Sequence, residues 1–432
     1  MAEIVPFSGI YYNPEKSSKI GDLICPSTDY LNEEWIIKLK ENGNNFCNAI
    51  YSEGEGTGKY RSSIHKLYGW LLRDVLVEDK TPTLYIIEQN VMLTGVEYKR
   101  YGIIGLLRID DYDGKIKKVE KTNEKYRDDK FSLIKETQFN LEPVIGLVND
   151  SSNSLELLLT PKKDGTVKSL LNFSDMNGNL NIIYRIDVPD LRDEIIRYLS
   201  DKVLYIIDNN RYEAALKYKN EAASMLKERI SGKEPFNYVL VNLFNAYDKG
   251  MRINPVSRLI KGLKMKPADL IKELSQKYKL SAIPFSDQNT EKLAERKLRM
   301  ILNDSLTSGG ISYGILLKAI PGKYLILNMS MSLSKDMIDT EVLESMIFSP
   351  LLGIKDVKND ASVGYAYSDS DAYRSVSEGQ FEAAFLTNEI KAAKLFDLAD
   401  NGKLIPYNSI SLYPRVMSGG MSFSYKYSKI SL

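Results

Sequence analysis

Four consecutive polar residues follow a short apolar run: Asp208, Asn209, Asn210 and Arg211. Residues 203–207 predict a strand and residues 212–230 an amphipathic helix, so the four residues are expected where a helix begins. Unpaired backbone N–H groups and the helix dipole favour an anion there, and a guanidinium can bind phosphate or carboxylate with two hydrogen bonds. The same residue types are also ordinary helix caps and turn formers. Both interpretations stay open from the chemistry of these residues alone.

Histidine and cysteine are too rare for several kinds of site. The chain has one histidine, His65, and two cysteines, Cys25 and Cys47. Structural zinc needs about four Cys or His ligands, and Ser-His-Asp or Cys-His-Asn catalysis needs a positioned imidazole. His65 lies beside the apolar stripe of a helix predicted at 59–77, so we expect a partly exposed helix residue without a catalytic role. Two cysteines make no disulfide framework, which is typical of a reducing cytoplasm.

The composition bounds the size and the partners of the protein. Its 432 residues suggest two or three domains or subdomains. Lys and Arg number 58 against 57 Asp and Glu, a balance that argues against bulk binding of nucleic acid or anionic lipid. No apolar run approaches the roughly 18 residues of a spanning helix, and the N-terminus lacks the pattern of a secretory leader. We therefore expect a cytoplasmic protein without a membrane or nucleic-acid partner.

Strand and helix patterns alternate along the chain. A hairpin is predicted across Gly95, and Asn177-Gly178 predicts a turn between strands at 169–173 and 180–185. The hairpins predict an α+β fold with mixed, largely antiparallel sheets and surrounding helices. Its expected subdomains are 1–195, 196–335 and 336–432. Further helices are expected at 190–200, 267–280, 289–302, 339–349 and 390–400.

The glycine-rich segment Gly54-Glu-Gly-Thr-Gly-Lys-Tyr60 is partly similar to a phosphate-binding loop. That motif needs four residues between its glycines and a Ser or Thr after its lysine. Here three residues separate Gly54 from Gly58, and Tyr60 follows Lys59. The segment therefore predicts a surface loop rather than a phosphate site.

Ordered segments along most of the chain resemble the domain-of-unknown-function 1015 family. Residues 203–215 resemble its signature box, Asp-Gly-His-His-Arg-Tyr-Glu-Ala-Ala. Other family landmarks are similar to Ile24-Cys-Pro-Ser-Thr-Asp-Tyr30, Leu84-Tyr-Ile-Ile-Glu-Gln89, Asn140-Leu-Glu-Pro-Val-Ile-Gly146, Glu382-Ala-Ala-Phe-Leu386 and the segment from Ile405 to Arg415. The box is degenerate, because Asn209-Asn210 replace its Gly-His-His. Two further family histidines are Val119 and Ser257 here, and a family lysine is Asn408.

The resemblance implies a ligand class and candidate residues. The family box is similar to the phosphate-binding box of partition-protein-like nucleotide-binding folds, which include free-serine kinases and cytidine triphosphate switches. It therefore implies a distantly related core that binds a nucleotide, with Mg, or another small phosphorylated or anionic metabolite. Because the histidines are missing, small-molecule phosphotransfer is expected to be weak or lost. The candidate ligand residues are Asp29, Glu120, Asp208, Asn209, Asn210, Arg211 and Arg258.

We also expect Arg211, Arg258 and Asp29 to lie together. The alternative function is a non-catalytic scaffold or regulatory subunit, which would associate with itself or with a protein partner such as an intact paralogue.

Overall fold

The structure is a computed structural model that describes every residue except 1, 18, 28–30, 53–57, 94, 113, 161–166, 227–230 and 432. Its backbone contacts define two compact units, residues 1–251 with 414–432 (unit 1) and residues 252–413 (unit 2). The three subdomains expected from the sequence have other boundaries and stay a prediction. Within the described part of the chain, no helix is long and apolar enough to span a bilayer.

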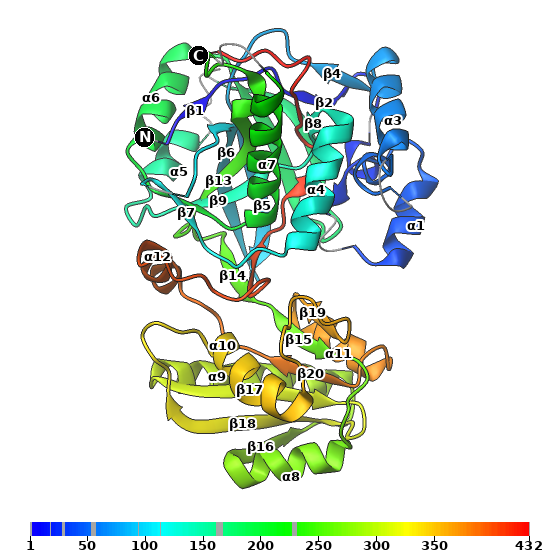
Figure 1. Ribbon diagram of the computed structural model, residues 1–432, viewed down its shortest axis with the longest axis vertical. Helices are drawn as coiled ribbons and strands as arrows, with labels where there is room; N and C mark the ends of the chain where they lie inside the picture. The colour runs from blue at the N-terminus through cyan, green and yellow to red at the C-terminus, as the bar shows by residue number, and fades with distance from the viewer. Residues whose placement is uncertain are drawn as a thin grey trace. The chain divides into compact units, whose positions relative to one another are not determined.

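Unit 1 is built around a nine-stranded mixed sheet (Figure 1). Among the strand pairs of its described residues, β13–β9 and β12–β7 are parallel and the others are antiparallel. In spatial order the strands are β10 (Val167–Ser174), β11 (Leu180–Ile186), β5 (Tyr85–Leu93), β6 (Val96–Arg108), β13 (Tyr238–Asn245), β9 (Val144–Val148), β12 (Leu204–Ile206) and β7 (Ile116–Lys118), with β1 (Ile4–Val5) paired to β6. Three short pairs join distant segments: β2 (Ile10–Tyr12) with β4 (Leu76–Glu78), β3 (Cys25–Pro26) with β22 (Met417–Ser418), and β8 (Phe139–Asn140) with β23 (Phe423–Ser424).

The helices of unit 1 include the two that position the candidate site, α4 and α7, which lie side by side (Figure 1). The unit contains α1 (Glu33–Glu41), α2 (Cys47–Ile50), α3 (Arg61–Leu72), α4 (Glu124–Thr137), α5 (Ser154–Leu159), α6 (Pro189–Ser200) and α7 (Asn209–Met225), with 3-10 turns η1 (Ile20–Asp22) and η3 (Pro235–Asn237).

Unit 2 is a six-stranded antiparallel sheet with helices on both faces. Alternate strand residues enter two separate apolar cores, as a pleated strand requires. Ile260 and Ile315 pack with Leu270 of α8, whereas Leu259 and Leu316 pack in the other core. The strand order is β16 (Lys279–Pro284), β18 (Lys323–Ser332), β17 (Gly310–Leu317), β20 (Ala383–Leu386), β15 (Ser257–Ile260) and β19 (Val363–Ala366), and β14 (Arg252–Pro255) pairs separately with β21 (Ile410–Tyr413). The helices are α8 (Pro267–Lys277), α9 (Gln288–Thr307), α10 (Asp339–Leu343), the π-helix η4 (Glu344–Leu352), α11 (Asp369–Ser377) and α12 (Ala392–Asp400).

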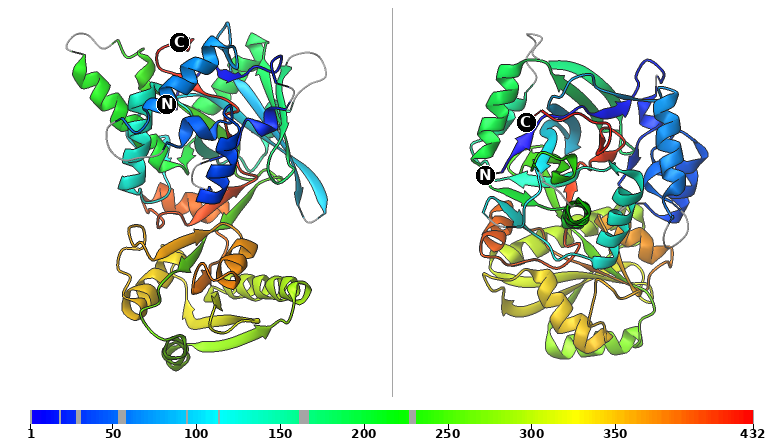
Figure 2. Two further views of the ribbon diagram at one scale, coloured as in Figure 1. Left: turned by 90° about the vertical axis from the view of Figure 1, so that its right-hand side faces the viewer. Right: turned by 45° about the horizontal axis from the view of Figure 1, so that its top comes forward.

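The predicted α+β fold with largely antiparallel sheets is confirmed. The hairpin across Gly95 is the long β5–β6 ribbon of Figure 2, in which Leu93 pairs with Val96. The Asn177-Gly178 hairpin also forms, as β10 and β11. Its loop spans residues 175–179, because Asp175 Oδ1 accepts hydrogen bonds from the backbone N–H groups of Asn177 and Asn179 at 2.8 and 3.0 Å.

Several helix boundaries differ from the sequence prediction. The helix predicted at 267–280 ends at Lys277, because strand β16 begins at Lys279, and the helix predicted at 289–302 continues to Thr307. The helix predicted at 212–230 begins at Asn209, because the side chain of Asp208 caps it by accepting the N–H of Arg211 at 3.2 Å. The helix predicted at 59–77 covers only 61–72. It ends before Asp74, whose φ of 52° is left-handed and cannot continue an α-helix. His65 is exposed on this helix, as expected.

Asp248 makes the stability of unit 1 depend on pH. Its buried carboxylate accepts N–H groups of Gly250 and Tyr101 at 2.7 and 3.2 Å, yet burial raises its pKa to about 6. Because the folded pKa lies above the unfolded value of about 3.9, the folded state holds this proton more tightly, and the resulting stability is lost as pH rises from about 4 to about 6.

We expect urea unfolding of Asp248→Asn and of the parent chain to show this difference. The stability of the variant relative to the parent should improve between pH 4 and pH 7, by up to about 3 kcal/mol. A constant difference across this window would show that Asp248 does not titrate there.

Candidate anion-binding site

Arg211 lies at the start of α7 with its guanidinium surrounded by internal partners. Its Nη2 is 2.9 Å from Glu142 Oε1, and its Nη1 is 2.6 Å from Asp208 Oδ2. Nη2 also donates to Ser27 Oγ at 2.8 Å. The other side of the Glu142 carboxylate receives Lys130 Nζ at 3.0 Å. We call Asp208, Arg211, Glu142 and Lys130 the Glu142 cluster.

The Glu142 carboxylate is held ionised inside the protein. The side chains of Glu142, Lys130 and Arg211 are only 4%, 4% and 6% exposed. Burial alone would raise the pKa of Glu142, but the charges of Arg211 and Lys130 outweigh burial and hold this pKa well below its usual range. The cluster therefore joins α7, α4 and the start of β9 through charges that water does not screen.

The remaining residues of the box bind neighbouring backbone. Asn209 Nδ2 donates to the carbonyl of Glu120 at 2.7 Å, and Asn210 Oδ1 accepts the N–H of Asn123 at 2.9 Å. These bonds fasten the segment before α4 to the start of α7. Five of the seven residues predicted from the sequence, namely Glu120, Asp208, Asn209, Asn210 and Arg211, thus share one corner of unit 1.

The other two candidates are Arg258 and Asp29. Arg258 belongs to β15 of unit 2, where it is fully buried. Its guanidinium donates to the carbonyls of Val256, Asn408 and Tyr407 at 2.9, 2.8 and 3.2 Å and contacts Glu344 Oε1 at 3.1 Å. Asp29 lies outside the described residues.

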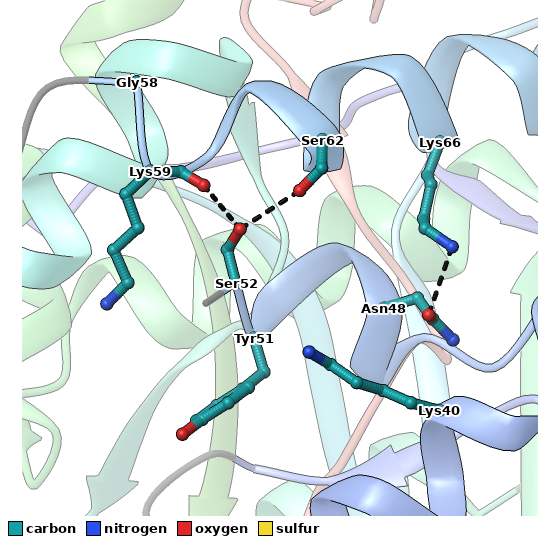
Figure 3. A pocket seen from close by; sticks show the side chains of 8 residues that line it. All are labelled: Lys40, Asn48, Tyr51, Ser52, Gly58, Lys59, Ser62 and Lys66. Carbon is teal, nitrogen blue, oxygen red and sulfur yellow. Dashed lines mark hydrogen bonds between the residues drawn. The ribbon is translucent and has the colours of Figure 1, made fainter. Parts of the chain in front are cut away.

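A cavity of about 320 Å³ opens in unit 1 beside α1, α2 and α3 (Figure 3). The sequence predicted no site here and placed Gly58 and Lys59 in a surface loop. Residues 53–57 of that loop lie outside the described part of the chain. The cavity, which we call the lysine pocket, is lined by Lys40, Asn48, Tyr51, Ser52, Gly58, Lys59, Ser62 and Lys66. The four-residue spacing of Ser62 and Lys66 is the signal that could have revealed it, because this spacing places both side chains on one face of α3.

Two of the pocket lysines have contrasting partners. Lys59 Nζ is 2.7 Å from Asp129 Oδ1. Lys66 Nζ donates to the neutral amide oxygen of Asn48 at 3.1 Å. Asn48 in turn uses its Nδ2 on the carbonyls of Asn42 and Asn45 at 2.9 and 3.1 Å, so its amide orientation is fixed and its oxygen faces Lys66.

The third lysine and two hydroxyls complete the pocket. Lys40 Nζ lies 5.1 Å from the centroid of the Tyr51 ring, a cation–π contact. Ser52 Oγ donates to the carbonyl of Lys59 and is 3.1 Å from Ser62 Oγ (Figure 3). Since the one proton of Ser52 is used on Lys59, the proton of Ser62 points to Ser52 in this state.

The described residues were also compared with the requirements of a metal site. No group of three His, Cys, Asp or Glu side chains in that part of the chain is arranged to hold a metal ion. Cys25 and Cys47 are both buried and free.

Comparison with known proteins identifies the family and no ligand. No curated protein matches the chain. Similar solved structures include a conserved hypothetical protein from Pyrococcus furiosus (12% identity, 72% of this chain and 93% of that chain, TM-score 0.35) and a free serine kinase in complex with AMP (12%, 69% and 83%, 0.31). A C-terminally truncated SbnI from Staphylococcus aureus is also similar (10%, 73% and 85%, 0.33). These similarities are too low to transfer a ligand or an activity. The model of the family described as "Protein of unknown function (DUF1015)" matches residues 4–322, so the resemblance read from the sequence is confirmed and the chain belongs to that family.

Proposed function

We propose that this protein binds a small phosphorylated or anionic metabolite in the lysine pocket. The observation that carries the proposal is the composition of the lining: three lysines and two serine hydroxyls surround one cavity, and none of its eight residues is acidic. Lysine ammonium groups and serine hydroxyls are hydrogen-bond donors suited to the oxygens of a phosphate or carboxylate. A volume of about 320 Å³ is at the lower end of the range for small-molecule sites, which favours a small metabolite.

The Glu142 cluster supports this pocket through α4. Lys130 of α4 binds Glu142, and the preceding residue, Asp129, binds Lys59 of the pocket and accepts the Tyr60 hydroxyl at 2.8 Å. Arg211 therefore acts on the pocket by fixing α4. Direct ligand contacts of Arg211, Arg258 and the other residues named from the sequence stay a prediction.

We limit the proposal to ligand binding. Phosphotransfer with a nucleotide and Mg stays a prediction from the sequence. The eight lining residues include no carboxylate or imidazole to accept a proton from a substrate hydroxyl. A scaffold that works only by association with other proteins needs no anion pocket. A measurement of anion binding therefore distinguishes ligand binding from the scaffold function.

Calorimetric titration with inorganic phosphate tests the proposal. Lys66→Met should weaken phosphate binding by about 1.5–3 kcal/mol, the usual contribution of a hydrogen bond to a charged group, which is about tenfold to a hundredfold in affinity. Lys277→Met is the matched control, because Lys277 is half exposed on α8 of unit 2 and its loss changes the net charge equally. Equal affinities of the two variants, or no binding by the parent chain, would refute the proposal.

A further inference from the structure

We infer that Cys25 and Cys47 form a redox-active thiol pair, which closes to an intramolecular disulfide when the protein is oxidised by hydrogen peroxide. These are the two cysteines of the chain, and both are free thiols in the structure. Neither of them lines the lysine pocket. The inference therefore goes beyond the proposed function, and its main test needs no ligand.

The fold brings two separate elements together at these cysteines. Cys25 begins β3, and Cys47 begins α2. The side-chain amide of Asn45 joins them, because its Nδ2 donates to the carbonyl of Ile24 at 3.1 Å and its Oδ1 accepts the backbone N–H of Cys47 at 2.9 Å. One amide thus ties the residue that precedes Cys25 to Cys47 itself.

The two thiols lie against each other inside unit 1. Both side chains are fully buried, and the thiols share a hydrogen bond. Burial raises the pKa of Cys25 well above its usual range, so this cysteine stays protonated. The hydrogen bond from Cys25 lowers the pKa of Cys47, which favours the thiolate there. The pair therefore combines a nucleophilic sulfur with a protonated sulfur beside it.

This combination suits a two-step oxidation. The Cys47 thiolate attacks one oxygen of hydrogen peroxide, the O–O bond breaks, and the sulfenic acid of Cys47 forms while hydroxide leaves with the proton that Cys47 had released. The sulfur of Cys25 then attacks the sulfenic sulfur, so that the S–S bond forms, the S–O bond breaks, and the proton of Cys25 leaves with the oxygen as water. Two thiols are oxidised, and one peroxide is reduced to water.

The oxidant can approach the pair at α2. This helix is a single turn, and the residue after Cys47, Asn48, lines the lysine pocket (Figure 3). A small molecule in that cavity is therefore one residue away from Cys47, and opening one turn costs much less free energy than unfolding the protein. A bulky aromatic disulfide reagent needs a wider opening, so we expect it to react with the native protein more slowly than peroxide does.

Closure of the disulfide should also alter the lysine pocket. A disulfide bond is about 2.05 Å long, much shorter than a hydrogen bond between thiols, so the two sulfurs must approach. Cys25 is anchored, because it pairs with Ser418 of β22, whose hydroxyl donates to Glu142 Oε1 at 2.9 Å. We therefore expect α2 to move together with Asn48, whose amide oxygen accepts Lys66 Nζ at 3.1 Å. This consequence rests on the proposed function, since its readout is phosphate affinity.

Mass spectrometry of the full chain after treatment with hydrogen peroxide tests the thiol pair. The parent chain should lose the mass of two hydrogen atoms, give a cross-linked peptide that contains Cys25 and Cys47, and recover both thiols in dithiothreitol. Cys25→Ala should instead gain oxygen at Cys47, because no second thiol resolves the sulfenic acid. Cys47→Ala should react at least about tenfold more slowly than Cys25→Ala, because the remaining cysteine stays protonated.

The outcomes separate the thiol pair from its link to the pocket. A parent chain that keeps both thiols, or gains oxygen without a cross-link, would overturn the inference, and equal reactivity of the two alanine variants would overturn the assignment of Cys47 as the attacking sulfur. Phosphate affinity of the oxidised parent should fall several-fold, and an unchanged affinity would overturn the movement of α2 alone. A chain that forms the disulfide and binds phosphate in neither state would refute the proposed function and leave the thiol pair standing.

Discussion

Replacing Glu142 by alanine should lower the free energy of unfolding by about 3–5 kcal/mol, the usual cost of removing one partner of a buried ion pair. The variant leaves Arg211 and Lys130 buried at 6% and 4% exposure without the carboxylate that lies between them. Urea unfolding at neutral pH measures this loss. Glu3→Ala is the matched control, because Glu3 pairs with Arg108 at the surface and should contribute less than about 1 kcal/mol.

The loss of stability in Glu142→Ala should also depend on pH. The folded pKa of Glu142 is depressed below the unfolded value of about 4.3. Its contribution is therefore fully present above about pH 4.3 and is lost as pH falls toward the folded pKa. The difference in the free energy of unfolding between the parent chain and Glu142→Ala should become smaller as the pH falls below about 4.3. A difference that becomes larger in acid would contradict the ionised state of Glu142.

Arg258→Met should destabilise the protein by about 3–5 kcal/mol, because it strips a fully buried guanidinium from three backbone carbonyls and from Glu344. Arg374→Met is the control in the same unit, since Arg374 is 63% exposed and pairs with Asp371 of its own helix. The same variants separate two roles for Arg258. Lost stability with unchanged phosphate affinity indicates a structural arginine, whereas lost phosphate affinity would support the ligand contact expected from the sequence.

The strand and the helix that flank the signature-box segment could be predicted from local patterns in the sequence. The apolar run before Asp208 predicted a strand, and the helical spacing of apolar residues after Arg211 predicted a helix. Both signals are properties of residues that are neighbours in the sequence. The same local view missed three residues of α7, since a side-chain cap can move the start of a helix. The resemblance to the family found the corner in which Asp208 and Arg211 lie.

The partners of these charges could not be predicted from spacing. Glu142 and Arg211 are 69 residues apart, and nothing in either segment selects the other. Lys66 and Asn48 are 18 residues apart and meet only because α2 packs against α3. Local comparison with a phosphate-loop motif also dismissed Lys59, which lines a cavity together with residues of α1, α2 and α3.

Asn209 and Asn210 have a structural role at the corner where the box lies. Asn209 and Asn210, which replace the family's Gly-His-His, still form backbone contacts that hold the segment before α4 to α7. An amide can make these hydrogen bonds and cannot exchange a proton at neutral pH. Asp129 of α4 in turn pairs with Lys59 of the lysine pocket.

A crystal structure of the protein with tungstate, a heavy tetrahedral dianion, tests the central claim most directly. We expect one ordered tungstate in the lysine pocket, with oxygens within about 3.2 Å of Lys66 Nζ and Ser62 Oγ, the ordinary range of hydrogen bonds. The same crystals of Lys66→Met should lose this peak. A fully occupied tungstate bound elsewhere, with an empty lysine pocket, would contradict the assignment of this cavity as the anion site.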